Sequence, residues 1–321
     1  MPPSFISHAQ NREDVVLWRA LRHIEHGTYV EIGANDPDVD SISKAFYERG
    51  WRGVLVEPVP ELADRLRAGR PEDVVVEAAI VAEDVSTVTL HSIPGTGLST
   101  LSDDIVRGHQ QRGWDVEDIE VRGKRLDNLL EQLGWEGRPL HFMTVDVEGA
   151  EIDVLRGVDL QRWRPWVLVV EATLPLTTTP NEEGWEPLIL EAGYRFCLFD
   201  GLSRFYVAEE HADELAGKLA YPACVLDDFV PVNEHEAHAR SERLRLECER
   251  QRDLVAQLSA DLVMWRGQVL ERWTEACALM RSQSTVDQSA AQRELDAMRS
   301  TLSWRVTRPL RAVRRATRSN P

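Results

Sequence analysis

The sequence lacks several patterns that would assign it at once to a large class of proteins. Its four cysteines (Cys197, Cys224, Cys248 and Cys277) form no C-x-x-C pair and show no zinc-ligand spacing, so we expect reduced thiols and a cytoplasmic protein. No apolar run approaches 18 residues, so no membrane-spanning helix is expected. The opening Met-Pro-Pro-Ser has neither the basic nor the apolar region of a signal peptide, and none is predicted.

Positive charge is scarce outside one short segment. The formal net charge is −17, yet residues 305–321 contain six arginines and no acid, so this tail carries +6 and the rest of the chain −23. An acidic body argues against nonspecific nucleic-acid binding, and no nucleic-acid partner is predicted. For the tail we expect peripheral contact with the inner membrane surface, the alternative being a solvated basic tail.

What the sequence does contain is an apolar strand that runs into a glycine turn. Residues 29–36 read Tyr-Val-Glu-Ile-Gly-Ala-Asn-Asp, and a helix-like stretch is expected over 39–49. The next strand, 53–56, ends on Glu57 and Pro58. In such a strand–turn–helix–strand unit the turn accepts a ligand at the helix N-terminus, and the acid that ends the second strand binds a ribose diol.

The turn does not suit a dinucleotide, because a pyrophosphate requires G-x-G-x-x-G and only one glycine is present. It suits S-adenosylmethionine, a sulfonium nucleoside without phosphates. Glu31 is predicted to bind the amino group of that cofactor, and Glu57 its two ribose hydroxyls. The alternative is a plain α/β turn with incidental acids. The predicted cofactor residues are Glu31, Gly33, Ala34, Asn35, Asp36, Glu57, Pro58 and Ala79, the last at the end of a third strand where adenine usually lies.

Strands and helices alternate through the following residues. A first helix is expected between an N-cap at Asn11 and a stop near Gly27. Further strands are expected at 73–80, 86–93, 141–145, 166–170, 194–199 and 204–207, and helices at 61–68, 126–134, 151–157 and 183–191. The pattern predicts an α/β fold whose mostly parallel sheet has an antiparallel hairpin at one edge.

From about residue 234 the sequence becomes helical and charged. Apolar positions recur about every 3.7 residues at Leu254, Leu258, Leu262, Trp265, Val269, Trp273, Cys277 and Met280. This is one helical stripe, although not a strict heptad, and the polar residues 281–294 are expected to interrupt it. Since a lone helix cannot bury such a stripe, self-association or packing on a partner is predicted.

Acids lie at the carboxyl ends of four predicted strands: Glu31 within its strand end, and Glu57, Asp146 and Glu171 directly after theirs. Ligands of open α/β sheets lie beyond these strand ends, and a buried carboxylate without a partner is costly, so the acids are expected to have a function. Asp146 is the first candidate for a general base. Asp146 and Glu171 could instead bind Mg²⁺ and lower a hydroxyl pKa. Glu148 joins the catalytic group, the alternative being an acid that stabilises a helix start.

Several segments together resemble the FkbM family of S-adenosylmethionine-dependent methyltransferases. They are residues 7–19, 30–36, 56–58, 145–151 and 199–206. The resemblance covers about residues 4–230 and implies a Rossmann-like class I methyltransferase sheet and O-methylation, often of sugar hydroxyls in polyketides and bacterial surface polysaccharides. It also implies that residues 31–36 and Glu57 contact the cofactor, while Asp146 and Glu148 line the active site. Pro37 stands where the family often has glycine.

Three further residues are predicted as substrate or lid contacts. The family resemblance suggests His8 and Gln10, which precede the first helix, although a lone histidine is more often structural. Ser99 lies in the turn-rich loop 94–100, which is either a lid or an ordinary hairpin connection.

The predicted organisation is a methyltransferase domain (1–230), a helical extension (234–303) and a basic tail (304–321). Residues 303–311 also resemble a tail of bacterial glycan-assembly enzymes. The predicted function is O-methylation of a saccharide, free or lipid-linked, of a cell-surface polysaccharide or glycolipid. The alternative is a non-catalytic scaffold of a glycan-assembly complex that has a degenerate methyltransferase domain.

Overall fold

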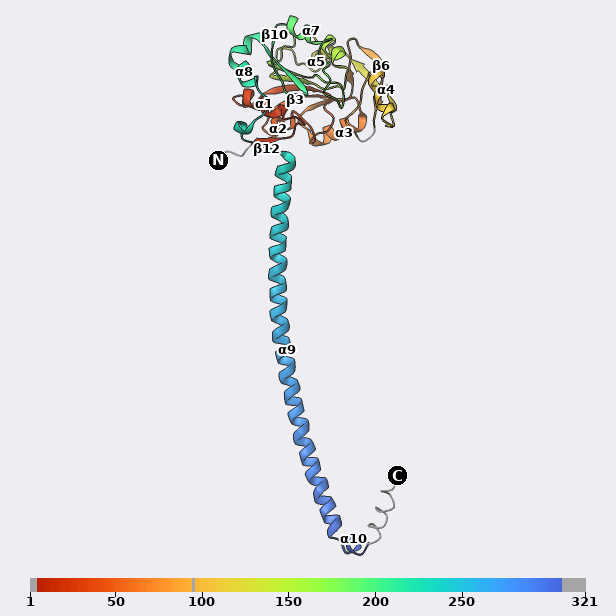
Figure 1. The fold of residues 1–321 in the computed structure, drawn as a ribbon, viewed down its shortest axis with the longest axis vertical. Helices are drawn as coiled ribbons and strands as arrows, with labels where there is room; N and C mark the ends of the chain where they lie inside the picture. Colours follow the sequence, from red (N-terminus) through yellow and green to blue (C-terminus); the bar gives the residue numbers. More distant parts are fainter. Residues whose placement is uncertain (1–4, 94–95, 308–321) are drawn as a thin grey trace. The chain divides into compact units, whose positions relative to one another are not determined.

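The computed structural model describes residues 5–93 and 96–307 and divides the chain into two units, residues 1–238 and 239–321, which are treated separately below (Figure 1). Most of the predicted basic tail, from residue 308 on, lies outside the described residues, so its membrane contact stays a prediction.

A seven-stranded sheet organises the first unit, in the order β10-β11-β9-β8-β2-β3-β4. Its strands are β2 (Thr28–Ile32), β3 (Arg52–Val56), β4 (Val74–Val76), β8 (Phe142–Val145), β9 (Val167–Glu171), β10 (Tyr194–Phe199) and β11 (Ser203–Ala208). The five strands from β9 to β4 are parallel, whereas β10 and β11 form an antiparallel hairpin at one edge. The predicted fold class, a Rossmann-like sheet with an antiparallel edge followed by a long C-terminal helix, is confirmed.

The strand order reverses beside β2. The chain proceeds from β2 to β3 and β4 on one side, and later places β8 and β9 on the other. In open α/β sheets such a switch point opens a crevice beyond the carboxyl ends of the strands.

Helices cover both faces of the sheet. One face packs against α1 (Glu13–Leu21), α2 (Lys44–Tyr47), α3 (Pro60–Gly69) and α8 (Ala212–Leu219), and the other against α5 (Leu126–Gln132), α6 (Glu151–Arg156) and α7 (Glu186–Glu191). Successive side chains of a strand point to opposite faces. Val30 and Ile32 therefore lie among the α5–α7 residues, while Tyr29 lies among the α1, α2 and α8 residues.

The helix predicted over 39–49 is wrong in its length, because α2 spans only four residues. Asp40 has a φ of 54°, which an α-helix does not allow, and the buried Arg70 fixes the preceding turn. The Arg70 guanidinium donates hydrogen bonds to the Pro37 carbonyl (2.7 Å) and to the Ser41 hydroxyl (2.7 Å). Residues 37–43 are thereby held in a turn instead of a helix.

The strand predicted over 73–80 is divided between two sheets. β4 pairs with β3, but β5 (Ala79–Ile80) pairs with β7 (Glu117–Lys124), and β7 pairs with β6 (Val85–Ser92) in a separate three-stranded sheet. The sequence analysis did not predict β7 or α4 (Asp103–Gln111). β7 follows β5 by nearly forty residues in the chain. The sequence near Ala79 and Ile80 therefore does not indicate that these residues pair with β7.

The predicted limits of the first helix are also wrong. Arg12, with a φ of 70°, occupies the N-cap position, and the Asn11 amide donates to the Asp200 carbonyl (3.3 Å) instead of capping α1. The helix ends at Leu21, well before Gly27. The short strand β1 (Phe5–Ser7), which pairs in parallel with β12 (Phe229–Pro231), was not predicted.

The helix α9 (Val232–Ser300) runs without a break through residues 281–294, so the predicted interruption is wrong. A short helix, α10 (Leu302–Val306), follows. Within residues 5–93 and 96–307, no helix is both long and apolar enough to cross a membrane.

Candidate active site

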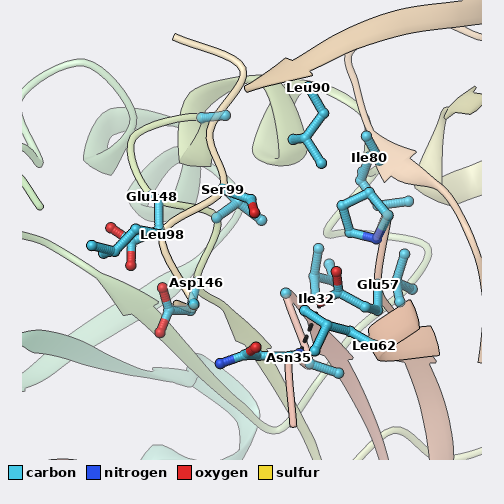
Figure 2. A pocket seen from close by; sticks show the side chains of 18 of the residues that line it. Ile32, Asn35, Glu57, Leu62, Ile80, Leu90, Leu98, Ser99, Asp146 and Glu148 are labelled. Atoms are coloured by element: carbon cyan, nitrogen blue, oxygen red, sulfur yellow. Dashed lines mark hydrogen bonds between the residues drawn. The ribbon is translucent and has the colours of Figure 1, made fainter. Parts of the chain in front are cut away.

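A cavity of about 210 Å³ lies beyond the carboxyl ends of β2 and β3 (Figure 2). It brings together most of the residues predicted as cofactor contacts: Gly33, Ala34, Asn35, Glu57, Pro58 and Ala79. Gln10, Ser99, Asp146 and Glu148 also line it. In Figure 2, Glu57 and Asn35 lie on one side of the cavity, and Asp146 and Glu148 on the other.

The turn after β2 can be made only by glycine. Gly33 has a φ of +83°, and its amide donates to the Val56 carbonyl of β3 (2.9 Å). A Cβ at this position would lie 1.7 Å from the carbonyl oxygen of Asp146, so even alanine would collide with the backbone. The single glycine of the motif thus allows three strand ends to approach one another closely.

Glu57 is fixed at the floor of this cavity and is 4 % exposed. Its Oε2 accepts from the Asn35 amide (2.9 Å) and its Oε1 from the Val59 amide (2.9 Å). Burial raises the pKa of Glu57 to about 7. Each carboxylate oxygen has a second lone-pair site, so Glu57 can still accept from both hydroxyls of a ribose.

Apolar side chains form the neighbouring wall. Leu62, Ile80 and Leu90 lie beside Glu57 and Ala79 around the same cavity. A carboxylate for a diol next to an apolar slot for an aromatic base matches an adenosine, so the residues present fit S-adenosylmethionine.

Three predicted site residues are not brought to either cavity wall within the described part of the chain. Glu31 lies on the α2 side of the sheet, where its carboxylate accepts from the Ile42 amide (3.1 Å) and the Ser43 hydroxyl. The alternation of side chains along β2 explains this position, because Glu31 is two residues from Tyr29 and therefore points to the same face of the sheet. Asp36 instead caps the Asp38 amide (2.8 Å) and pairs with Arg65.

His8 is the third of these residues. It is buried, and its Nδ1 lies 3.3 Å from the Asp38 carbonyl oxygen. Burial lowers the pKa of His8, which makes the neutral ring the dominant form at pH 7. The position is structural, since it joins the N-terminal segment to the turn after β2.

A second cavity, of about 610 Å³, adjoins the first. Four residues line both cavities: Gln10, Leu98, Asp146 and Glu148. The remaining wall consists of Glu171, Thr173, Leu176, Thr177, Thr178, Thr179 and Leu202. The carboxylates of Asp146 and Glu148 therefore stand where the two cavities meet.

Asp146 directly follows β8, and Glu171 is the last residue of the neighbouring parallel strand β9, with Val145 paired with Val170. Burial raises the pKa of both carboxyl groups, and a hydrogen bond between them lowers that of Asp146 and raises that of Glu171. This hydrogen bond favours the proton on Glu171 and the negative charge on Asp146.

Glu148 stands at a strained position, with a φ of 53°. Burial, followed by the charge of Asp146, raises its pKa to about 8. Its Oε2, like the Oε2 of Glu171, is buried without a hydrogen-bond partner among the described residues. Unpaired buried carboxyl oxygens at a cavity wall are available to a ligand.

The loop that contains Ser99 is anchored to both sides of the site. The Thr100 hydroxyl donates to the Glu148 carbonyl (2.7 Å), and Gly97 approaches Asn35 so closely that a Cβ would lie 2.7 Å from the Asn35 Nδ2. Thr100 is also paired with His91 through two backbone hydrogen bonds. The loop is thus both a strand connection and a part of the cavity wall.

The sequence analysis missed several wall residues. Glu13 and Asp40 line the first cavity, and burial raises the pKa of both, that of Glu13 to about 8. Thr177, Thr178 and Thr179 line the second. The run of threonines shortly after the strand that ends on Glu171 was the available signal, because that segment follows a carboxyl strand end.

The predicted Mg²⁺ site at Asp146 and Glu171 stays a prediction. Among the residues described, no group of three or more His, Cys, Asp or Glu side chains could hold a metal ion, but the predicted site consists of only two.

Fold and site together define an S-adenosylmethionine-dependent methyltransferase. The family profile described as Methyltransferase FkbM domain matches residues 31–196, slightly more than half of the chain. The chain belongs to the FkbM methyltransferase family, and the predicted family is confirmed.

Solved structures of other methyltransferases are distantly similar. A TehB-like SAM-dependent methyltransferase from Corynebacterium glutamicum is 8% identical, with 60% of this chain and 87% of that chain covered and a TM-score of 0.34. An O-methyltransferase from Bacillus cereus, solved with SAH, is 13% identical (63% and 82% covered, TM-score 0.35). A putative RNA methyltransferase from Pyrococcus horikoshii is 11% identical (62% and 82%, TM-score 0.33). No curated protein sequence matches the chain.

Proposed function

We propose that this methyltransferase transfers the methyl group to a hydroxyl of a saccharide. The observation that carries the proposal is the common wall of the two cavities, formed by Asp146 and Glu148. A cofactor in the first cavity and an acceptor in the second would meet at these carboxylates. A base at the meeting point is what a hydroxyl nucleophile requires and a thiolate or a free amine does not.

The first cavity, which would hold the cofactor, is already formed in the structure. When bound, S-adenosylmethionine supplies an electrophilic methyl group on its sulfonium. Glu57 would accept from the ribose hydroxyls, and Ile80 and Leu90 would provide apolar surface for the adenine. Such positioning of reactants can supply roughly 7–11 kcal/mol of the barrier.

On the acceptor side, Asp146 takes the proton of the attacking hydroxyl. Glu171 donates a hydrogen bond to Asp146, which lowers the pKa of Asp146 and opposes the increase that burial causes. A positioned base of this kind typically contributes about 10²–10⁴-fold. Glu148, with an unpaired oxygen, can accept from a second hydroxyl of the acceptor.

The composition of the second cavity supports a saccharide. Threonine hydroxyls and carboxylates provide many hydrogen-bond partners for a polyol, and Leu176 and Leu202 provide apolar surface for the faces of a sugar ring. No Lys, Arg or His belongs to the described part of this wall, which disfavours phosphate-rich acceptors. The family resemblance adds surface polysaccharides and glycolipids as the proposed source of the acceptor.

The proposal is tested by incubating the protein with methyl-labelled S-adenosylmethionine and fractionated cell-envelope glycans. Label should enter a glycan fraction, and mass spectrometry of the hydrolysed product should place it on a sugar oxygen. The Asp146→Asn protein serves as the control and should transfer label at least about 100-fold more slowly. Label on nitrogen, or equal transfer by Asp146→Asn, would contradict the O-methylation mechanism. Absence of cofactor binding altogether would favour the non-catalytic scaffold instead.

A further inference from the structure

Apolar side chains repeat every eleven residues along α9, including the polar segment 281–294. One series is Leu254, Trp265, Ala276, Asp287 and Met298, the second is Leu258, Val269, Met280 and Ala291, and the third is Leu262, Trp273, Ser284 and Leu295. Among these thirteen positions, only Asp287 and Ser284 are not apolar. Eleven residues make three turns at 3.67 residues per turn, close to the ordinary α-helix, so these positions form one stripe.

No residue of α9 that the structure describes is buried. Trp265 and Trp273, the largest side chains of the stripe, are 60% and 68% exposed. The stripe extends over 45 residues, from Leu254 to Met298, or about 66 Å at a rise of 1.5 Å per residue. A continuous exposed apolar surface of this length is typical of an interaction surface.

Charged residues beside the stripe indicate what covers it. Asp261 is followed five residues later by Arg266, and the same pair recurs 33 residues on as Glu294 and Arg299. At this period a step of five residues turns the helix by about 130°, which places these two acids on one flank of the stripe and these two arginines on the other. Arg250 and Arg272, eleven residues before and after Asp261, lie on the same flank as the acids. Since 33 residues are three complete repeats, both pairs occupy equivalent positions.

These flanks are complementary to those of a second copy. When two such helices lie parallel and in register, Asp261 meets the Arg266 of its partner and Glu294 meets the Arg299. In the same register Arg250 faces Val255 and Arg272 faces Cys277, so no two like charges meet at these positions. An antiparallel pair with the stripes fully overlapped would bring equal flanks together, with Asp261 within about one turn of Glu294. Flanking charges of this kind set partner and orientation in coiled coils.

We propose that α9 pairs in parallel and in register with α9 of a second copy of this chain, as a coiled coil with an eleven-residue repeat. The repeat predicts a nearly straight or slightly right-handed supercoil. In this arrangement the Asp287 side chains of the two chains lie opposite each other within the apolar stripe, and the two like charges weaken the packing there. Replacing it should strengthen the pair, so Asp287→Leu is expected to lower the dimer dissociation constant.

The mass of the full-length protein in solution tests the pairing. Light scattering after gel filtration should give twice the 36.5 kDa of one chain. Leu262→Arg, within the stripe, should reduce the mass to that of one chain. Its matched control is Val263→Arg, because Val263 adjoins Leu262, is 69% exposed against 55%, and lies outside the stripe, about 130° around the helix from its centre. A wild type with the mass of one chain, or equal effects of the two substitutions, would overturn the proposal.

Cysteine cross-linking tests the orientation. With Cys248 and Cys277 replaced by serine, Val269→Cys should form a disulfide between chains under mild oxidation, because the two copies of residue 269 meet in the parallel register. Val263→Cys in the same background should not. A dimer that resists cross-linking at residue 269 would refute the parallel arrangement. Neither test depends on cofactor or substrate, so each outcome is separate from the proposed methyl transfer.

Discussion

The backbone amide of Asn35 donates to the Oε2 of Glu57 over 2.9 Å. This bond joins the glycine turn after β2 to the carboxylate that ends β3, so the two parts of the cofactor motif form one unit. It also fixes the orientation of Glu57, leaving the free lone pairs directed at the cavity. A substitution in the turn after β2 should therefore alter the orientation of Glu57, and a substitution of Glu57 should alter the conformation of the turn.

Gly33→Ala is expected to destabilise the fold far more than an alanine at another positive-φ glycine. Its Cβ would lie 1.7 Å from the Asp146 carbonyl oxygen, whereas a Cβ at Gly134, whose φ is +67°, meets nothing within 4 Å. Gly134→Ala should therefore lower the free energy of unfolding only through the strain of a left-handed backbone, by about 1–2 kcal/mol. Urea unfolding of both variants is the measurement. Equal losses would show that β2 and β8 are not in contact at this turn.

Asp146→Asn should reduce turnover by about 10²–10⁴-fold while leaving the cofactor affinity within a few-fold of wild type. Asn has nearly the same shape, but it cannot accept the proton of the acceptor hydroxyl. Single-turnover kinetics with saturating cofactor measures the chemical step. Turnover within a few-fold of wild type would remove Asp146 from the role of base.

Glu171 is a positioning residue for Asp146, and its role should appear in the pH profile. Glu171→Ala removes the hydrogen bond that lowers the pKa of Asp146. The base must be ionised to act, so in Glu171→Ala the rise in rate on the acidic side of the pH profile should move to higher pH. In Glu171→Gln, which can still donate to Asp146, this rise should lie close to its wild-type pH. If both variants keep the wild-type profile, the two carboxyl groups do not share a proton.

The ligand-free protein should become less stable between pH 5.5 and 8.5. The folded-state pKa values of Glu57, about 7, and of Glu13 and Glu148, about 8, lie above the value of about 4.5 that these groups have when exposed. The folded state thus holds protons that the unfolded state releases, and this stability is lost as the pH rises through 7–8. Thermal unfolding should show a Tm several degrees lower at pH 8.5.

Glu57→Gln provides the control for this effect. The amide has no proton to lose, so the difference in Tm between pH 5.5 and 8.5 should shrink. An unchanged difference would mean that Glu57 is ionised throughout this range in the folded protein.

The sequence predicted the parts of the site that depend on local order. Gly33, Glu57 and Asp146 each follow a strand directly and Glu171 ends one, and parallel strands bring such positions to one edge of the sheet. The prediction for Glu31 ignored strand alternation, which directs this side chain toward α2.

The remaining differences have long-range causes. The turn at 37–43 is fixed by Arg70, which lies about thirty residues further on, and the division of the strand at 73–80 depends on pairing with β7. No pattern within either segment contains this information. The thirteen-position stripe of α9, in contrast, can be found from the sequence alone once an eleven-residue period is tested.

Calorimetric titration with S-adenosylmethionine at pH 8, with the wild type and Glu57→Gln compared, measures whether the cavity at Glu57 holds the cofactor. We expect one site per wild-type chain and an affinity at least tenfold weaker for Glu57→Gln, since hydrogen bonds to a charged group contribute about 1.5–3 kcal/mol each. Circular dichroism should confirm that the variant is folded. A wild type that does not bind the cofactor, or a variant that binds it equally well, would contradict the assignment of this cavity.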